Sequence, residues 1–171
     1  MSREKIVRAS VLEERLRSDP GAREGLVLAN GLFDLLHVGH VRYLEGARAA
    51  GRRLLVAVNS DESARRLKGA GRPVYPLQER LEVLAAFACV DWVTWFEEDN
   101  VEGLLRSLRP AIHAKGTDYT EETVPERALA RELGIRTVIV GDPKGHASSD
   151  VIRRIRSAFS VPGELHGSSG R

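Results

Sequence analysis

The chain has 171 residues, enough for one domain with a full hydrophobic core. Its 26 basic and 24 acidic residues leave a formal net charge of +2, and the basic residues are scattered, so neither nucleic acid nor a membrane surface is an expected partner. A single cysteine excludes a disulfide framework, and the charged start MSREKIVRAS lacks the apolar core of a secretory signal, so we expect a cytoplasmic protein.

Taken in chain order, short apolar runs alternate with stretches of helical periodicity. After a short helix at 10–18, the apolar runs predict strands at 25–30, 53–59, 91–96, 110–115 and 136–141. The intervening and following stretches predict helices at 39–50, 61–67, 77–87, 100–107, 122–133 and 148–159. This alternation favours an α/β doubly wound fold, with a five-stranded, mostly parallel sheet and helices on both faces.

The end of the last helical pattern is the expected domain boundary. We expect residues 1–159 to form a single domain. The segment 160–171, SVPGELHGSSGR, is rich in Gly and Ser and is expected to be a flexible C-terminal tail.

Polar residues gather where the predicted strands end. They lie at 30–40, 59–61, 115–119 and 142–149. In doubly wound folds the carboxyl ends of the strands form the ligand-binding edge of the sheet. The sequence therefore predicts a site there, centred on the segment after the first strand.

Two histidines, His37 and His40, stand in that segment, within LVLANGLFDLLHVGH. On a helix they would share a face, so the spacing alone could be accidental. A zinc site would need a third ligand, and His113 on another predicted strand is not favoured for it. Gly31 and Gly39 allow close approach of the backbone, and the following helix N-terminus supplies free N–H groups. We therefore expect a phosphate-binding turn.

The residues NGLFDLLHVGH match the G-x-F-D-x-x-H-x-G-H signature of the cytidylyltransferase-like nucleotidyltransferases. The resemblance extends from about Lys5 to Ile155. The stretches AVNSDESARRLKGAGRP, FEEDN, KGTDY and GHASSDVIRRI are similar to the D-glycero-β-D-manno-heptose 1-phosphate adenylyltransferases, in their stand-alone form. Two departures are Thr117, where these enzymes usually have Gly, and Ala147, where they usually have Ser.

The resemblance implies transfer of AMP from ATP to a sugar 1-phosphate with release of pyrophosphate. It implies Mg²⁺ as the partner of ATP, with no protein ligand named for the ion and no organic cofactor. We further expect a homo-oligomer, with a dimer as the first choice. The partners expected are ATP and the phosphorylated sugar, without nucleic acid or membrane.

The same resemblance implies roles for individual residues. His37, His40 and Lys68 are the expected catalytic residues. A larger set is expected to bind the nucleotide: Gly31, Leu32, Phe33, Gly39, Asn59, Asp61, Lys115, Gly116, Asp118, Gly145, Ser148 and Ser149. Further candidates for substrate contacts are Asp34, Arg72 and Arg80.

Several of these residues also have an ordinary structural explanation. Asn59 and Asp61, like Ser148 and Ser149, could serve as helix caps. Asp34 is expected to orient the loop or a histidine rather than to accept a proton. The segment 68–76, with its two glycines, is either a solvated connection or a lid that closes over bound nucleotide, and we expect the lid.

Two other functions remain open. One is a cytidylyltransferase acting on glycerol 3-phosphate or a related acceptor. Those enzymes usually carry an Arg before the late Gly-x-Ser-Thr-Thr element, where this chain has Asp142-Pro143-Lys144, so adenylyl transfer is favoured. The other is a non-catalytic nucleotide-sensing module, which would be expected to lose a histidine or the loop lysine.

Overall fold

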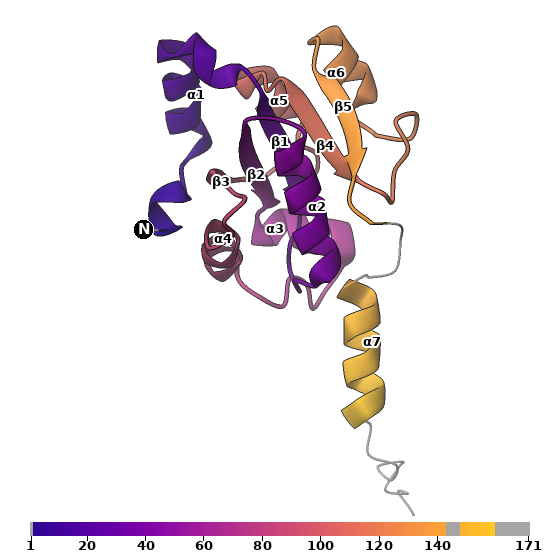
Figure 1. Ribbon diagram of the computed structural model, residues 1–171. Coiled ribbons are helices and arrows are strands. Elements are labelled where there is room, and N and C mark those ends of the chain that lie inside the picture. Colours follow the sequence, from indigo (N-terminus) through magenta and orange to yellow (C-terminus); the bar gives the residue numbers. More distant parts are fainter. Residues whose placement is uncertain (1, 143–147, 160–171) are drawn as a thin grey trace, which may run out of the picture.

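A five-stranded sheet in which every strand pair is parallel forms the centre of the protein (Figure 1). The computed structural model describes residues 2–142 and 148–159. The strands are β1 (Leu26–Gly31), β2 (Arg53–Asn59), β3 (Trp92–Phe96), β4 (Ile112–Gly116) and β5 (Arg136–Val140). Their spatial order is β3-β2-β1-β4-β5, so β1 lies in the middle and the chain crosses over between β3 and β4.

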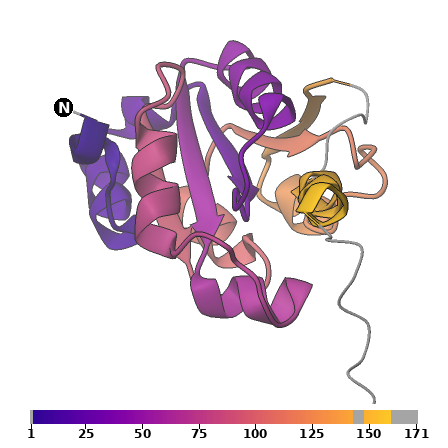
Figure 2. The same ribbon diagram turned by 90° about the horizontal axis from the view of Figure 1, so that it is seen from below.

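Helices cover both faces of the sheet, as Figure 2 shows from below. The α-helices of the body are α1 (Ala9–Ser18), α2 (Val38–Ala49), α3 (Asp61–Lys68), α4 (Leu77–Ala85), α5 (Glu102–Leu108) and α6 (Arg127–Glu132). Two short 3-10 helices, η1 (Ser2–Lys5) and η2 (Pro20–Arg23), precede β1 and were not predicted. The last helix is α7 (Ser148–Phe159).

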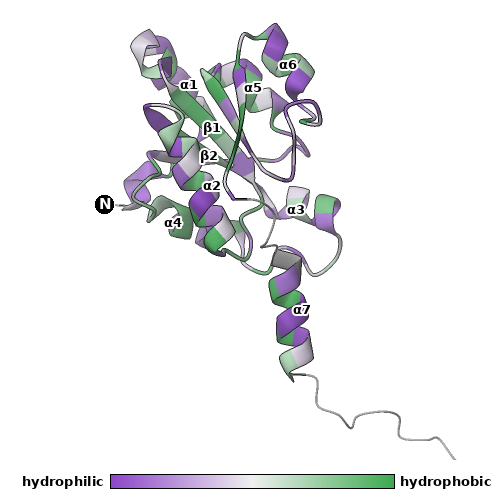
Figure 3. Ribbon diagram, turned by 45° about the vertical axis from the view of Figure 1, so that its right-hand side comes forward, coloured by the Kyte–Doolittle hydropathy of each residue, from purple (hydrophilic) through white to green (hydrophobic). Residues whose placement is uncertain are grey.

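Alternation along the strands divides the core into two layers. Leu26 and Leu28 of β1 face a layer that α1, α5 and α6 complete. Val27 and Ala29 face the opposite layer, which α2 and α4 complete. Both sets of side chains are fully buried, and Figure 3 shows the central strands as hydrophobic. This explains why the central strands β1 and β2 are mostly apolar, on both faces.

The predicted fold class is confirmed, and the sheet is fully rather than mostly parallel. Several predicted boundaries were wrong. The helix expected at 77–87 ends at Ala85, and the one expected at 100–107 starts at Glu102. The helix expected at 122–133 is confined to 127–132, because Pro125 disfavours helical backbone at the residue before it. The strand expected at 110–115 starts at Ile112, after the left-handed Arg109 and after Pro110, which has no N–H to donate.

Helix α7 extends away from the sheet in Figures 1 and 3. Its predicted range, 148–159, agrees with the structure. Ile155 and Phe159 are exposed to 51% and 80%. Gly145 and the predicted tail 160–171 lie outside the described residues, as do the side chains of Ser148 and Ser149. Within the described ranges, no helix combines the length and apolar character that a bilayer crossing requires.

Candidate active site

A cavity of about 710 Å³ opens at the carboxyl edge of the sheet, where the sequence predicted a site. It is large enough for a nucleotide-sized ligand. Residues from β1, α2, β2, α3, β4 and the segments that follow them line it. The predicted site residues that line it are Gly31, Leu32, Phe33, Asp34, His37, Gly39, His40, Asn59, Lys68, Arg72, Lys115, Gly116 and Asp118.

The turn between β1 and α2 has a tightly packed backbone. Phe33 is 3% exposed and adopts a left-handed φ of 48°, which costs energy in a residue other than glycine. Its ring packs beside His40 and Tyr43, with centroids 5.5 Å and 6.3 Å away. A Cβ on Gly31 would come within 3.2 Å of the Phe33 ring. Gly31 and Phe33 thus shape the turn that carries the histidines.

The two histidines stand side by side at the N-terminus of α2, with ring centroids 4.0 Å apart. His37 is the N-cap residue, and its backbone N–H donates to Nδ1 of His40 over 3.3 Å. The backbone N–H of His40 donates to the carbonyl of His37 over 2.9 Å. Both imidazoles line the cavity, so the sequence spacing that predicted the pair also brings it to the site.

His40 is a neutral hydrogen-bond donor at neutral pH. Burial first, and the neighbouring His37 second, lower the pKa of His40 to about 4. Because Nδ1 accepts the hydrogen bond from His37, the single proton of the neutral ring must be on Nε2. Nε2–H is then available to an acceptor such as a phosphoryl oxygen.

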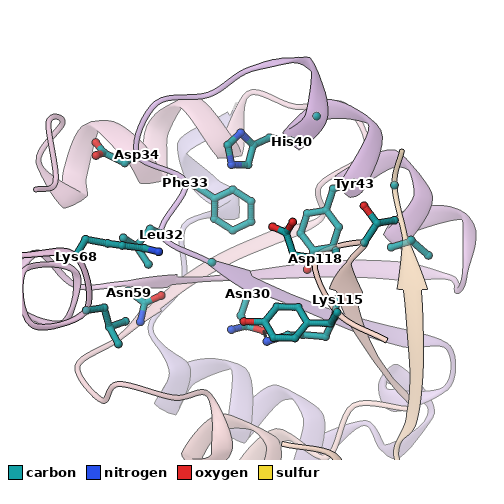
Figure 4. A pocket seen from close by; sticks show the side chains of 18 of the residues that line it. Asn30, Leu32, Phe33, Asp34, His40, Tyr43, Asn59, Lys68, Lys115 and Asp118 are labelled. Atoms are coloured by element: carbon teal, nitrogen blue, oxygen red, sulfur yellow. Dashed lines mark hydrogen bonds between the residues drawn. The ribbon is translucent and has the colours of Figure 1, made fainter. Parts of the chain in front are cut away.

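On one side of the cavity lie Lys68 and Asn59 (Figure 4). Lys68 is the last residue of α3 and is exposed to solvent. The glycines that follow, Gly69 and Gly71, have φ values of 87° and 85°, where other residues would be strained. Lys68 therefore stands at the start of a segment whose backbone depends on glycine.

Asp34 holds the second half of that segment. Its carboxylate accepts from Nε of Arg72 at 2.6 Å, and from the backbone N–H groups of Val74 and Tyr75 at 2.7 and 3.0 Å. The Asp34 side chain is 1% exposed. As expected, Asp34 orients a loop. Arg72 lines the cavity with its charge already paired to this carboxylate.

Arg80 and Asp61 are not among the residues that line the cavity. The Arg80 side chain is 1% exposed and pairs with the Asp61 carboxylate at 2.7 Å. It also donates hydrogen bonds to the backbone carbonyls of Tyr75 and Leu32, and so links the histidine turn to the segment 68–76. The capping role considered for Asn59 and Asp61 belongs instead to Ser60, whose hydroxyl accepts from the N–H of Ser63.

On the other side of the cavity lie Lys115 and Asp118 (Figure 4). Lys115 is buried, and its Nζ lies 3.3 Å from the carboxylate of the buried Glu126. The ammonium also lies 4.8 Å from the centre of the Tyr119 ring. A paired, buried lysine is a weaker attractor for phosphate than a free one, which distinguishes Lys115 from Lys68.

Sequence reasoning missed several residues of the site. Tyr43, whose hydroxyl donates to the carbonyl of Ala114, joins α2 to β4 beneath the cavity. Glu126 carried no sequence signal, because eleven positions separate it from Lys115. Asn30, which lines the cavity, was noted among the polar residues at the end of the first predicted strand but was not placed among the site residues.

Metal ligands are not clustered in the described part of the chain. No three His, Cys, Asp or Glu side chains come together there as they would around a bound ion. In particular His113 faces Asn30, with Nε2 3.0 Å from the amide oxygen.

Comparisons with known proteins give the family of the chain. A family model described as Cytidylyltransferase-like matches residues 28–157. The bifunctional protein HldE of Pelobacter propionicus is 42% identical over 91% of this chain, and that of Streptomyces coelicolor is 47% identical over 84%. The chain spans about a third of the length of these relatives, 32% and 30% respectively.

Among solved structures, the lipopolysaccharide core biosynthesis protein of Thermoplasma volcanium matches 71% of this chain and 99% of its own, with a TM-score of 0.61 and 25% identity. The pantothenate synthetase of Thermus thermophilus matches 84% of this chain and 63% of its own, with a TM-score of 0.60 and 18% identity, and so shares the fold.

A parallel α/β sheet with a paired-histidine turn at its ligand-binding edge is the arrangement of a nucleotidyltransferase. The chain belongs to the cytidylyltransferase-like family.

Proposed function

We propose that the protein is an adenylyltransferase that moves AMP from ATP to D-glycero-β-D-manno-heptose 1-phosphate, acting in the cytoplasm. Support comes from the family match and from the relatives named HldE, together with the stretches similar to heptose 1-phosphate adenylyltransferases. The similar Thermoplasma protein, a lipopolysaccharide core biosynthesis protein, points the same way. The products would be ADP-heptose and pyrophosphate.

The proposed reaction needs no covalent enzyme intermediate. A phosphate oxygen of the acceptor attacks the α-phosphorus of ATP, forming one P–O bond as the bond to the departing pyrophosphate breaks. Positioning and stabilisation of charge are the protein's main contributions to such a transfer. A cavity with donors at its centre and a cationic side chain at one rim suits that task.

The observation that carries the proposal is the neutral His40 at the N-terminus of α2. Its Nε2–H can donate to an α-phosphoryl oxygen, where negative charge grows in the transition state. His37 would donate beside it, and the N-terminus of α2 would add positive potential. Lys68, across the cavity, would contact the phosphates as a mobile charge.

Mg²⁺ would accompany the triphosphate. The described residues do not form a cage of carboxylates, so we expect phosphate oxygens and water to be its main ligands. The ion would neutralise charge on the triphosphate, and the histidines and Lys68 would act on the same charge from the protein side.

A panel of pyrophosphate-release assays tests the proposal. ATP and CTP are each paired with heptose 1-phosphate and with glycerol 3-phosphate. We expect turnover with ATP and the heptose phosphate. Turnover with CTP and glycerol 3-phosphate alone would identify the cytidylyltransferase alternative, and nucleotide binding without turnover on any pair would identify a nucleotide-sensing module.

A further inference from the structure

Below the cavity floor, β4 places an imidazole against the end of β1. His113 lies opposite Leu28 in the parallel pairing of these strands and is fully buried. Its Nε2 lies 3.0 Å from Oδ1 of Asn30, a residue that lines the cavity. Neither residue was assigned a role in the chemistry above.

The chemistry of the neighbours determines which way the Asn30 amide points. Nζ of Lys115 can only donate, and it lies 3.5 Å from the same amide atom that His113 contacts. If the amide were reversed, its NH₂ group would face this ammonium, donor against donor. The atom facing His113 and Lys115 is therefore the oxygen, and His113 must carry its proton on Nε2 to donate to it.

Burial keeps His113 in that protonation state. Desolvation first, and the charge of Lys115 second, lower the pKa of His113 to about 4, so the ring is neutral at neutral pH. Nδ1 of His113 is buried without a hydrogen-bond partner among the described residues, as expected of an unprotonated ring nitrogen facing an apolar layer. Lys115 is held in turn by Glu126, at 3.3 Å.

We propose that His113 is a positioning residue that, with Lys115, fixes the Asn30 amide so that its NH₂ group donates hydrogen bonds into the cavity, to an oxygen atom of the bound nucleotide. Asn30 ends β1 directly beside Gly31, at the base of the histidine turn. Its Nδ2 makes no hydrogen bond to the described part of the protein. This inference rests on the proposed function for the identity of the ligand.

A matched pair of variants at position 113 separates the effect of the hydrogen bond to Asn30 from the effect of filling the buried space. His113→Gln retains an amide N–H near the position of Nε2, whereas His113→Leu fills the space without a donor. Misplacing one hydrogen-bond donor should weaken ATP binding about tenfold in His113→Leu. We expect His113→Gln to recover most of that affinity. Calorimetry of ATP binding and the KM for ATP measure both, while kcat should change less.

A double-mutant cycle with Asn30→Ala tests whether His113 acts through Asn30. We expect His113→Leu to lower ATP affinity in the wild-type background and to leave it unchanged when residue 30 is alanine. Asn30→Asp, which presents an acceptor instead of the NH₂ group, should also lower the affinity at least tenfold. This variant decides the matter if His113→Leu does not fold.

Two results would overturn the inference. One is an ATP affinity within twofold of wild type in a folded His113→Leu protein, and the other is wild-type affinity in Asn30→Asp. Because calorimetry does not depend on turnover, a protein that binds ATP as expected but releases no pyrophosphate would contradict the proposed function alone. Absence of ATP binding by the wild-type protein would overturn both.

Discussion

Burial holds two imidazoles of this protein, those of His40 and His113, in the neutral state. Each has one identified hydrogen bond that determines the position of its proton, and in both rings the proton is on Nε2. A neutral N–H donor can approach phosphate oxygens without the desolvation cost of a full charge. The protein therefore surrounds its cavity with donors. Of the cations that line the cavity, Lys115 and Arg72 are paired with carboxylates, whereas Lys68 has no ion-pair partner within residues 2–142 and 148–159.

At the residue scale we first predict that His37→Ala and His40→Ala each lower kcat by about 10²–10³. Donors aimed at charge that develops in the transition state act mainly on kcat, so the KM for ATP should rise less. Steady-state pyrophosphate release measures both constants. His166→Ala, in the C-terminal segment, is the matched histidine control and should retain wild-type kcat. A wild-type kcat in either cavity variant would remove that histidine from the catalytic set.

The low pKa values of the same rings predict a loss of stability in mild acid. His40 and His113 each titrate near pH 4 in the folded protein, below the ordinary value of 6.5. The unfolded chain therefore binds protons first, and the free energy of unfolding falls as the pH drops from 6.5 toward 4. For His113 the loss between pH 7 and pH 5 is about 2 kcal/mol.

Urea unfolding at pH 7 and pH 5 measures this effect. His113→Leu removes the titrating ring, so the difference in the free energy of unfolding between the two pH values should shrink in this variant. A difference as large as that of the wild type would show that His113 does not contribute to the acid sensitivity.

At the scale of elements, the sequence was informative wherever local pattern decides the structure. All five strands were predicted to within two residues, because a strand buried on both faces of a parallel sheet is rich in apolar residues. The histidine turn was found because its residues are contiguous. The bond from His113 to Asn30 could not be found, since it depends on β4 lying beside β1. The pairing of Lys115 with Glu126 could not be found either, since it depends on the path of the eleven positions of chain between them.

The structure divides the segment 68–76 into two parts that are expected to differ in mobility. Asp34 accepts the N–H groups of Val74 and Tyr75, so these amides should resist hydrogen exchange whether or not nucleotide is bound. Residues 68–71, which start at the last residue of α3 and include two left-handed glycines, should become protected only with ATP and Mg²⁺. Equal exchange at 68–71 in both states would contradict the lid.

Lys68 provides the matching functional test of that lid. Lys68→Ala should weaken ATP binding and slow turnover, because the cavity then loses its exposed, mobile cation. Lys68→Arg should recover only part of the loss, since a guanidinium fork does not reproduce a compact ammonium. Lys5→Ala on η1, remote from the cavity, is a lysine control for the change in net charge. Full activity in Lys68→Ala would leave the segment as an ordinary solvated connection.

The turn between α2 and β2 packs against the start of β1 and should not tolerate a side chain. A Cβ on Gly51 would meet the carbonyl oxygen of Gly25 and lie 2.6 Å from Val27 Cγ2. We expect Gly51→Ala to lower the free energy of unfolding by about 1–3 kcal/mol. In α5, by contrast, a Cβ on Gly103 would have only Oε1 of Glu98 nearby, at 3.7 Å. We therefore expect Gly103→Ala to stabilise the helix by up to about 1 kcal/mol. Urea unfolding of both variants measures the contrast.

At the scale of the whole molecule, the described residues of the two core layers all lie before position 142. The segment 160–171 offers few apolar residues to bury, so its deletion should leave the fold and the activity nearly intact. Thermal unfolding is the measurement. A fall in Tm of more than about 4 °C would show that this segment contributes to stability.

The oligomeric state stays a prediction. We expect a homo-oligomer, with a dimer as the first choice, and light scattering at two protein concentrations measures it. The exposed Ile155 and Phe159 of α7 are the positions where a polar substitution would reveal whether this helix takes part.

The strand order also has a kinetic consequence. Strands β1, β2 and β3 follow one another in the sequence and also lie side by side in the sheet. Strand β4, by contrast, pairs with β1 although 83 positions of the sequence separate Asn30 from His113. Closing so long a loop is entropically costly before its contacts form. During synthesis the β1–α2–β2 half, with its histidine turn, can therefore assemble first, and the cavity is completed only when β4 and β5 dock. Pulse-labelling hydrogen exchange during refolding should show the amides of β4 and β5 becoming protected after those of β1 and β2.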